Sequence, residues 1–357
     1  MKSSLTQAEK EQLFKSGYVI VPQAVDAAAI RTARELIEAA LPEDKHQLLV
    51  PGKLATDQRI TDLFNDSCLA RILKREMGPF PPAVSCQVAV LPAFNQLGGG
   101  PGTHVDGGWS GEVPKHANEI EPVTGRPKEA ARYFGENDER RGTNDGLLWM
   151  DPQRRLSYGS YTALVGVALN DQLEPGNGQF AVLEGTHEQV EAAFREQRDS
   201  GGVVGPEGLG WPRIHVDAQG RTSPNGLPDS VRRISDARAK AGNATEHWPW
   251  PELTPVLLRA GDAVIALHSC PHTPTPNLGP NPRMNIYFRI RRLREGNPNE
   301  GSRRVAHGVS DHPDRGYFGQ FLEYPDGYDP FQISIDRLCD HWSEWDGLQD
   351  LVHQRGS

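Results

Sequence analysis

The sequence predicts a mainly β protein with flanking helices, whose strands form an antiparallel sandwich or barrel. Between residues 83 and 292, short runs of strand composition follow one another without regularly interleaved helices, which argues against a βαβ sheet. The chain of 357 residues also contains 37 Gly and 29 Pro. Both residue types destabilise helix interiors, so this composition argues against a bundle of long helices.

The N-terminal segment carries helix signals. Thr6 and Glu9 have the spacing of a capping box, and Gly17 provides a stop signal. The β-branched residues of 18–22 then predict a short strand. Asp26 is positioned to cap a second helix. The first helix, the strand and the second helix therefore follow one another directly.

A further helical stretch is predicted over roughly residues 60–77, so the first 80 residues are expected to be mainly helical. The strand candidates that follow are residues 83–91, 160–169, 178–186, 254–260, 262–269 and 284–292. Within this region only residues 187–198 suggest a helix.

We expect one domain over residues 1–357. It comprises a helical part (1–80), a core (81–293) and a C-terminal extension (294–357) that packs on the core, with a helix near 333–345. Two long polar inserts, near 110–158 and 199–250, interrupt the core. Loops of this length usually serve as lids or binding loops.

Composition narrows the class of partner and the compartment. The formal net charge of −9 argues against a nucleic-acid partner. The four cysteines form no CxxC pair, which fits a reducing compartment. The polar start does not resemble a signal peptide, and no apolar run approaches the roughly 18 residues of a membrane span. We expect a cytoplasmic protein with a small-molecule substrate and no membrane partner; its oligomeric state stays open.

The candidate chemistry begins with a His-x-Asp triplet, which occurs three times, at His104, His215 and His312. On a strand, the His and Asp of such a triplet share one face. With one distant His they would form the 2-His-1-carboxylate triad of non-haem Fe(II) enzymes. We favour His104 with Asp106, because this pair follows a strand and precedes the remaining strand series. The triplet at His215 runs into a turn-like segment, and the one at His312 contains a Pro typical of surface loops.

Two histidines compete as the third ligand, His268 and His272, near the end of one predicted strand. We favour His272 because Arg283 begins the next strand eleven residues later and could return beside the metal. Arginine offers a two-pronged fork for a carboxylate. His268 is interpreted as a barrel histidine or as a residue behind the ligands.

Together these motifs resemble the phytanoyl-CoA dioxygenase family of Fe(II)/2-oxoglutarate oxygenases, over most of residues 5–292. The segment 5–30 resembles the family's opening helix and strand, and 167–188 its mid-core segment. The distal segment of the family has a His, an Asn five residues later and an Arg eleven residues later. Here these are His272, Asn277 and Arg283.

The resemblance implies a double-stranded β-helix core of the jelly-roll or cupin-like type. It implies His104, Asp106 and His272 as iron ligands, with Arg283 as the partner of the distal carboxylate of 2-oxoglutarate. The cofactor set would be Fe(II), 2-oxoglutarate as co-substrate, and O2. Because Asp106 is present, related halogenases with a small residue there fit poorly, and hydroxylation with release of succinate and CO2 is the expected outcome.

Further contacts are open hypotheses. Gln87, Ser85 and Thr162 are polar residues of predicted strands and could contact 2-oxoglutarate. Residues that could line a substrate pocket are Trp109, Trp149, Tyr158 and Asn285. Arg289 alternates with Arg283 and should share its face. The alternatives are a cupin-like metal enzyme that does not use 2-oxoglutarate and a non-catalytic ligand-binding jelly roll.

Overall fold

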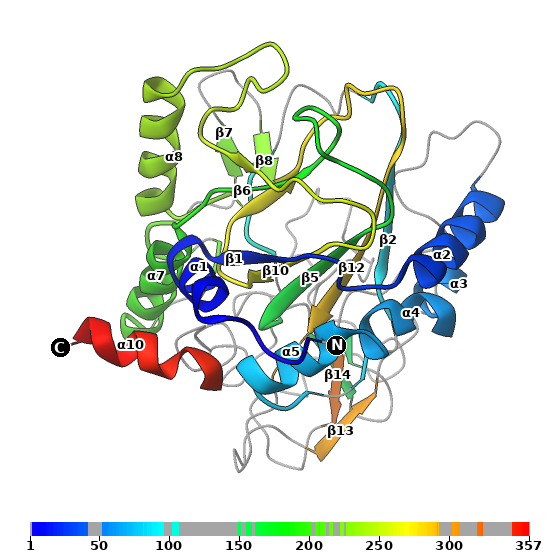
Figure 1. Ribbon diagram of the computed structural model, residues 1–357. Coiled ribbons are helices and arrows are strands. Elements are labelled where there is room, and N and C mark those ends of the chain that lie inside the picture. Colours follow the sequence, from blue (N-terminus) through cyan, green and yellow to red (C-terminus); the bar gives the residue numbers. More distant parts are fainter. Residues whose placement is uncertain are drawn as a thin grey trace.

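The structure is a computed structural model (Figure 1). It describes residues 2–41, 52–80, 82–83, 85–95, 102–106, 149–150, 155–158, 161–201, 204–206, 208–211, 214–216, 222–224, 226–290, 292, 302–306, 320–323 and 345–356. In this part of the chain, antiparallel sheets are surrounded by helices, which agrees with the predicted class of a mainly β protein with flanking helices.

A five-stranded antiparallel sheet forms the centre of the molecule. Its strands, in spatial order, are β1 (Tyr18–Val21), β10 (Ala263–Leu267), β5 (Ala163–Ala168), β12 (Arg283–Ile290) and β2 (Gln87–Leu91). Each matches a segment that the sequence predicts as a strand, so these five predictions are confirmed. Every residue of β5 and β10 is buried, which explains why these strands read as continuous apolar runs without polar alternation.

A smaller sheet lies over the central one. Its strands are, in order, β11 (His272–Pro274), β6 (Phe180–Val182) and β9 (Thr254–Pro255). The ring of Phe180 from this sheet lies 5.9 Å from the ring of Tyr287 on β12, so the two sheets face each other. Tyr287 pairs with Gly166 of β5, where a Cβ atom would come within 2.9 Å of the tyrosine ring. Glycine is therefore required at this position to make room for an aromatic side chain between the sheets.

The N-terminal helices begin and end at the predicted signals. Helix α1 spans Gln7–Ser16 with the capping box of Thr6 and Glu9, and Gly17 ends it in the left-handed conformation with φ 81°. The Asp26 side chain accepts hydrogen bonds from two backbone N–H groups at the start of α2 (Ala27–Ala40). Both caps were predicted from the sequence and are confirmed.

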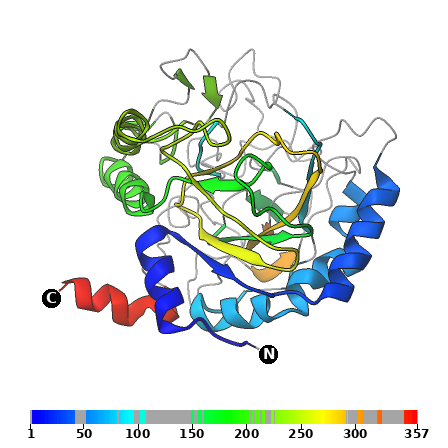
Figure 2. The same ribbon diagram turned by 45° about the horizontal axis from the view of Figure 1, so that its top comes forward.

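The helical stretch predicted over residues 60–77 is confirmed, and two helices occupy it. These are α4 (Gln58–Asn65) and α5 (Cys68–Glu76), preceded by the short α3 (Gly52–Ala55). The break has a local cause: the Ser67 hydroxyl accepts a hydrogen bond from Leu69 N and so caps a new helix. Figure 2 shows these helices along one side of the sheets.

The second insert contains a helix that the sequence analysis missed. Helix α7 (His187–Asp199) was predicted, whereas α8 (Asp229–Ala241) lies within the tract expected to be a polar loop. Only Val231 is buried in α8, and most of its residues are charged, Ser or Ala, so its composition resembles that of a polar loop. His215 of the second His-x-Asp triplet lies in β7 (Ile214–Val216), which pairs with β8 (Thr222–Pro224), whereas Asp217 and the turn-like segment after it fall outside the described residues.

The first insert and the C-terminal extension contribute to one sheet. Its strands are, in order, β13 (Ser302–Ala306), β14 (Gln320–Glu323), β4 (Arg155–Tyr158) and β3 (Trp149–Met150). The chain continues through a 3-10 helix, η5 (Asp346–Leu348), into α10 (Gln349–Gly356). The helix predicted near 333–345 falls outside the described residues, apart from Trp345. Where the chain is described, no helix combines the length and apolarity needed to cross a membrane.

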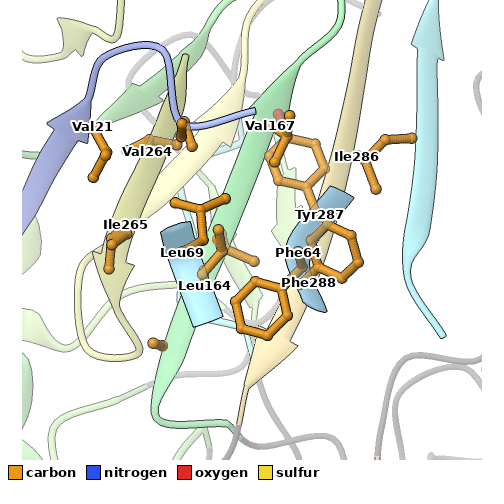
Figure 3. Close-up of a cluster of buried hydrophobic side chains, with 14 of the residues drawn as sticks. Val21, Phe64, Leu69, Leu164, Val167, Val264, Ile265, Ile286, Tyr287 and Phe288 are labelled. Atoms are coloured by element: carbon orange, nitrogen blue, oxygen red, sulfur yellow. The ribbon is translucent and has the colours of Figure 1, made fainter. Parts of the chain in front are cut away.

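The main core lies between the central sheet and helices α4 and α5 (Figure 3). Phe64 of α4 and Phe288 of β12 are both fully buried, and their ring centroids are 5.3 Å apart. Phe64 also contacts Phe80 at 5.8 Å. This aromatic group fixes the helices to the strand that carries Arg283 and Arg289.

Replacing Phe288 with Ala should therefore lower the free energy of unfolding by about 3–5 kcal/mol, because it removes a fully buried ring and leaves a cavity. Urea denaturation measures the change. Leu209→Ala is the control, since Leu209 is 59% exposed and its removal should change stability by less than ~0.5 kcal/mol. Similar losses in both variants would contradict the described core.

Candidate metal centre

Three side chains converge at one end of the small sheet. His104 pairs with His272 through two backbone hydrogen bonds, from His104 N to His272 O (3.1 Å) and from His272 N to His104 O (2.9 Å). His104 Nε2 lies 3.1 Å from Asp106 Oδ1, and His272 Nε2 lies 3.7 Å from Asp106 Oδ2. All three ligand atoms lie within 4.8 Å of one another, a spacing that could hold a metal ion. The structure thus brings together the three residues that the sequence singled out.

Both imidazoles are oriented from behind by the backbone. His104 Nδ1 lies 2.8 Å from the Gly102 carbonyl oxygen, and His272 Nδ1 lies 3.0 Å from that of Cys270. A carbonyl oxygen only accepts, so each Nδ1 carries a hydrogen and donates it. Each Nε2 is then the nitrogen turned toward Asp106, which is the arrangement typical of metal-binding histidines.

The electrostatics keep Asp106 ionised. Burial by itself would raise the pKa of Asp106, but the charge of Arg289 and the contacts with His104 and His272 outweigh it and hold the pKa well below its ordinary value. Burial also tends to lower the pKa of His104, yet its contact with Asp106 prevails and raises it. An ionised carboxylate with two imidazoles is a donor set suited to Fe(II).

Asp106 has further partners that the sequence analysis did not assign. Arg289 donates to Asp106 Oδ2 through Nε (3.1 Å) and Nη2 (2.6 Å). The Tyr161 hydroxyl donates to the same oxygen at 3.3 Å. Burial and the nearby Asp106 charge raise the Tyr161 pKa well above its ordinary value, so this hydroxyl keeps its proton. His268 Nε2 lies 2.7 Å from the Asp106 backbone oxygen, in agreement with the expectation that His268 lies behind the ligands.

The three candidate ligands face a cavity of about 330 Å³ between the two sheets. Arg283, which is 3% exposed, lines the same cavity. Its Nε donates to the Gly178 carbonyl oxygen at 2.7 Å, whereas its buried Nη1 has no hydrogen-bond partner among the described residues. Gly178 has φ 73°, and a Cβ there would come 2.8 Å from Leu91 Cδ2, so this supporting turn requires glycine. The cavity therefore presents an unsatisfied cationic donor as well as a metal-binding group.

The other predicted 2-oxoglutarate contacts occupy different environments. Gln87 lines the cavity, and its Oε1 accepts a hydrogen bond from Arg289 Nη1 at 2.9 Å. The Thr162 hydroxyl instead accepts from Arg292 N at 3.0 Å, and Thr162 is not part of the cavity lining.

The predicted substrate contacts are only partly described. Asn285 is buried and donates to the Tyr287 hydroxyl at 2.9 Å, so it is linked to the cavity through Tyr287, which lines it. Trp109 lies outside the described residues. Trp149 and Tyr158 lie on β3 and β4, but their side chains fall outside the description. Their substrate roles stay predictions.

Removing one of the three convergent side chains should abolish tight binding of a divalent metal. For Asp106→Ala we expect affinity for Co(II), used as a spectroscopically visible probe, to fall by more than ~100-fold, beyond the usual effect of residues behind the ligands. Isothermal titration calorimetry measures the affinity. His247→Ala removes an exposed histidine and is the matched control. Wild-type affinity in Asp106→Ala would contradict the site.

Comparison with known proteins gives remote likenesses only. No family model matches the sequence, and no curated protein matches it, so the resemblance to the phytanoyl-CoA dioxygenase family stays a prediction. Among solved structures, HygX from Streptomyces hygroscopicus, with nickel and 2-oxoglutarate bound, is 13% identical over 81% of this chain and 88% of that chain, with a TM-score of 0.42. EvdO2 from Micromonospora carbonacea var. aurantiaca, complexed with 2-oxoglutarate, is 14% identical over 84% and 97%, with a TM-score of 0.38. SnoK, a non-haem α-ketoglutarate-dependent carbocyclase from nogalamycin biosynthesis, is 12% identical over 80% and 83%, with a TM-score of 0.40. The similar structures thus include proteins that bind a metal and 2-oxoglutarate.

Proposed function

We propose that the protein is a non-haem Fe(II)/2-oxoglutarate-dependent dioxygenase that hydroxylates a small-molecule substrate and releases succinate and CO2. One observation carries this proposal: the metal-binding group and a buried arginine with an unsatisfied N–H line the same cavity. A metal site alone would suit many enzymes. The arginine adds a reason for an anionic co-substrate to bind beside the metal.

In this proposal His104, Asp106 and His272 hold Fe(II) with one atom each and leave its remaining positions open. When bound, iron and 2-oxoglutarate supply the oxidation: O2 is consumed, the keto acid becomes succinate and CO2, and one oxygen atom enters the substrate. The protein's part is to orient these groups and to exclude water. Because Asp106 occupies the third ligand position, hydroxylation is favoured over halogenation.

Arg283 anchors the distal carboxylate of 2-oxoglutarate. Its guanidinium is held by the Gly178 carbonyl through Nε, which leaves its other nitrogens for the ligand. The buried Nη1 gains a partner when a carboxylate binds, and a charge-assisted hydrogen bond in a buried site is strong. Gln87, which also lines the cavity, is a further candidate contact.

The surroundings of the cavity suit chemistry away from water. Phe180 packs against His272, with ring centroids 5.0 Å apart, and Leu164 also lines the cavity. Such apolar walls strengthen the electrostatic contacts inside and limit side reactions. Two facing antiparallel sheets with the metal-binding group at one end also support the proposal that the core is a double-stranded β-helix.

Arg283→Gln should weaken 2-oxoglutarate binding about 10–100-fold while Fe(II) binding is retained, because the substitution removes a charge-assisted hydrogen bond worth ~1.5–3 kcal/mol. Under anaerobic conditions, Fe(II) and 2-oxoglutarate should give a weak visible charge-transfer band, and its titration measures the affinity. Arg34→Gln is the control, since Arg34 lies on an exposed helix face and pairs with Glu38.

Two results would separate this function from its alternatives. A cupin-like metal enzyme without 2-oxoglutarate would bind metal but give neither the band nor succinate. A non-catalytic binding protein would release no succinate under O2 with any substrate tested. Unchanged 2-oxoglutarate affinity in Arg283→Gln would remove the role of Arg283.

A further inference from the structure

The two oxygens of the Asp106 carboxylate have different surroundings. Oδ2 accepts from Arg289 Nε and Nη2 and from the Tyr161 hydroxyl. Oδ1 lies 3.1 Å from His104 Nε2, and Oδ2 lies 3.7 Å from His272 Nε2, which is too far for a hydrogen bond. Three donors saturate the lone pairs of Oδ2, and a cation next to it would face the positive guanidinium. Oδ1 is therefore the oxygen available to a metal ion.

The guanidinium of Arg289 is itself held from other sides. Its Nη1 donates to Gln87 Oε1 at 2.9 Å, and its Cζ lies 5.6 Å from the centroid of the Tyr161 ring. The Arg289 and Asp106 side chains are 16% and 18% exposed, so the ion pair is largely shielded from water. A partly buried arginine fork with this many contacts holds one orientation, unlike an exposed ion pair.

From this geometry we propose that Arg289 is a positioning residue, which presents Asp106 to the metal through Oδ1 alone by occupying Oδ2. The inference rests on the proposed function only in requiring a metal ion at His104, Asp106 and His272. Without Arg289, the carboxylate is free to rotate or to bind through both oxygens. Binding through both would fill a coordination position that the reaction needs open.

Strand β12 offers an internal comparison. Arg283 and Arg289 lie on the same face of this strand, and both line the cavity. They are six residues apart, which places their Cα atoms about 20 Å apart along the strand. Only Arg289 is paired with Asp106. The two arginines therefore have separable roles: Arg289 should affect the metal, and Arg283 should affect the anionic co-substrate.

The test measures Co(II) affinity by calorimetry in the full-length chain, without co-substrate. Arg289→Gln and Arg289→Lys should each lower affinity about 10–100-fold, the usual cost of losing a residue that orients a ligand. Arg289→Lys is the sharper variant, because it keeps the charge but lacks the fork. Arg34→Lys is the control, since Arg34 lies on an exposed helix face and pairs with Glu38, and it should leave Co(II) affinity unchanged.

A second readout reports coordination directly. The visible absorption of bound Co(II) weakens as its coordination number rises, so both Arg289 variants should absorb more weakly than wild type if Asp106 binds through two oxygens. Should an Arg289 variant fail to fold by circular dichroism, Tyr161→Phe removes one donor to Oδ2 and should shift affinity and spectrum in the same direction by a smaller factor.

The outcomes distinguish this inference from the proposed function. Wild-type affinity and spectrum in both Arg289 variants would overturn the positioning role while leaving the oxygenase proposal intact. Wild-type behaviour in Arg289→Lys alone would also overturn it, because charge without the fork would then suffice. A wild-type protein that binds Co(II) but releases no succinate would refute the oxygenase and leave the role of Arg289 standing. A wild-type protein that binds no divalent metal would refute both.

Discussion

The backbone pairing of His104 with His272 is the contact on which the site depends. Two hydrogen bonds join a short segment, 102–106, to strand β11. Because Asp106 follows His104 by two residues, this one pairing brings all three candidate ligands to the same place. The carbonyl groups of Gly102 and Cys270 then orient both imidazoles, so backbone geometry sets position and rotation together.

Strand β12 contributes two arginines to the lining of the cavity. Arg283 stands at its first residue and Arg289 close to its end, with Tyr287 between them on the cavity side. The Arg289 guanidinium neutralises a carboxylate of the protein, whereas Nη1 of Arg283 has no hydrogen-bond partner within the part of the chain that the structure describes. On the opposite face of the strand, Phe288 packs against Phe64, and this contact fixes the strand against helix α4. One face of strand β12 thus packs in the core, and its other face carries the arginines of the candidate site.

Helix caps and strands could be predicted from the sequence because they depend on residues that are close together in the chain. The caps at Thr6 and Asp26 and the strands of the central sheet depend on residues close in the chain, and they are confirmed. Helix α8 is not predicted because its residues are mostly polar and it buries only Val231, although Val231 and Ile234 have helical spacing. The break at Ser67 does carry a local signal, because three consecutive polar residues, Asn65, Asp66 and Ser67, separate the two helices and the last of them is an N-cap.

In the candidate site too, residues that belong to short sequence patterns could be predicted, whereas contacts between distant residues could not. The His-x-Asp triplet and the spacing from His272 to Arg283 are short-range signals, and the structure brings those residues together around one cavity. The contact between Arg289 and Asp106 joins residues 183 positions apart, and no local pattern encodes it. Thr162 and Gln87 are both polar residues in apolar strands of the sequence. Only the fold shows that Gln87 lines the cavity and that Thr162 does not.

The buried Nη1 of Arg283 gives a reason why ligand binding should stabilise the folded protein. None of the described residues accepts a hydrogen bond from Nη1, and a buried donor that gains an acceptor is relieved of a cost of about 1–3 kcal/mol. A ligand that supplies the acceptor would bind the folded chain and not the unfolded one, and at 100 times its dissociation constant it would add about 2.7 kcal/mol to the free energy of unfolding. At higher concentrations of such a ligand, a larger fraction of the protein would stay folded, and the protein would resist heat and proteolysis better.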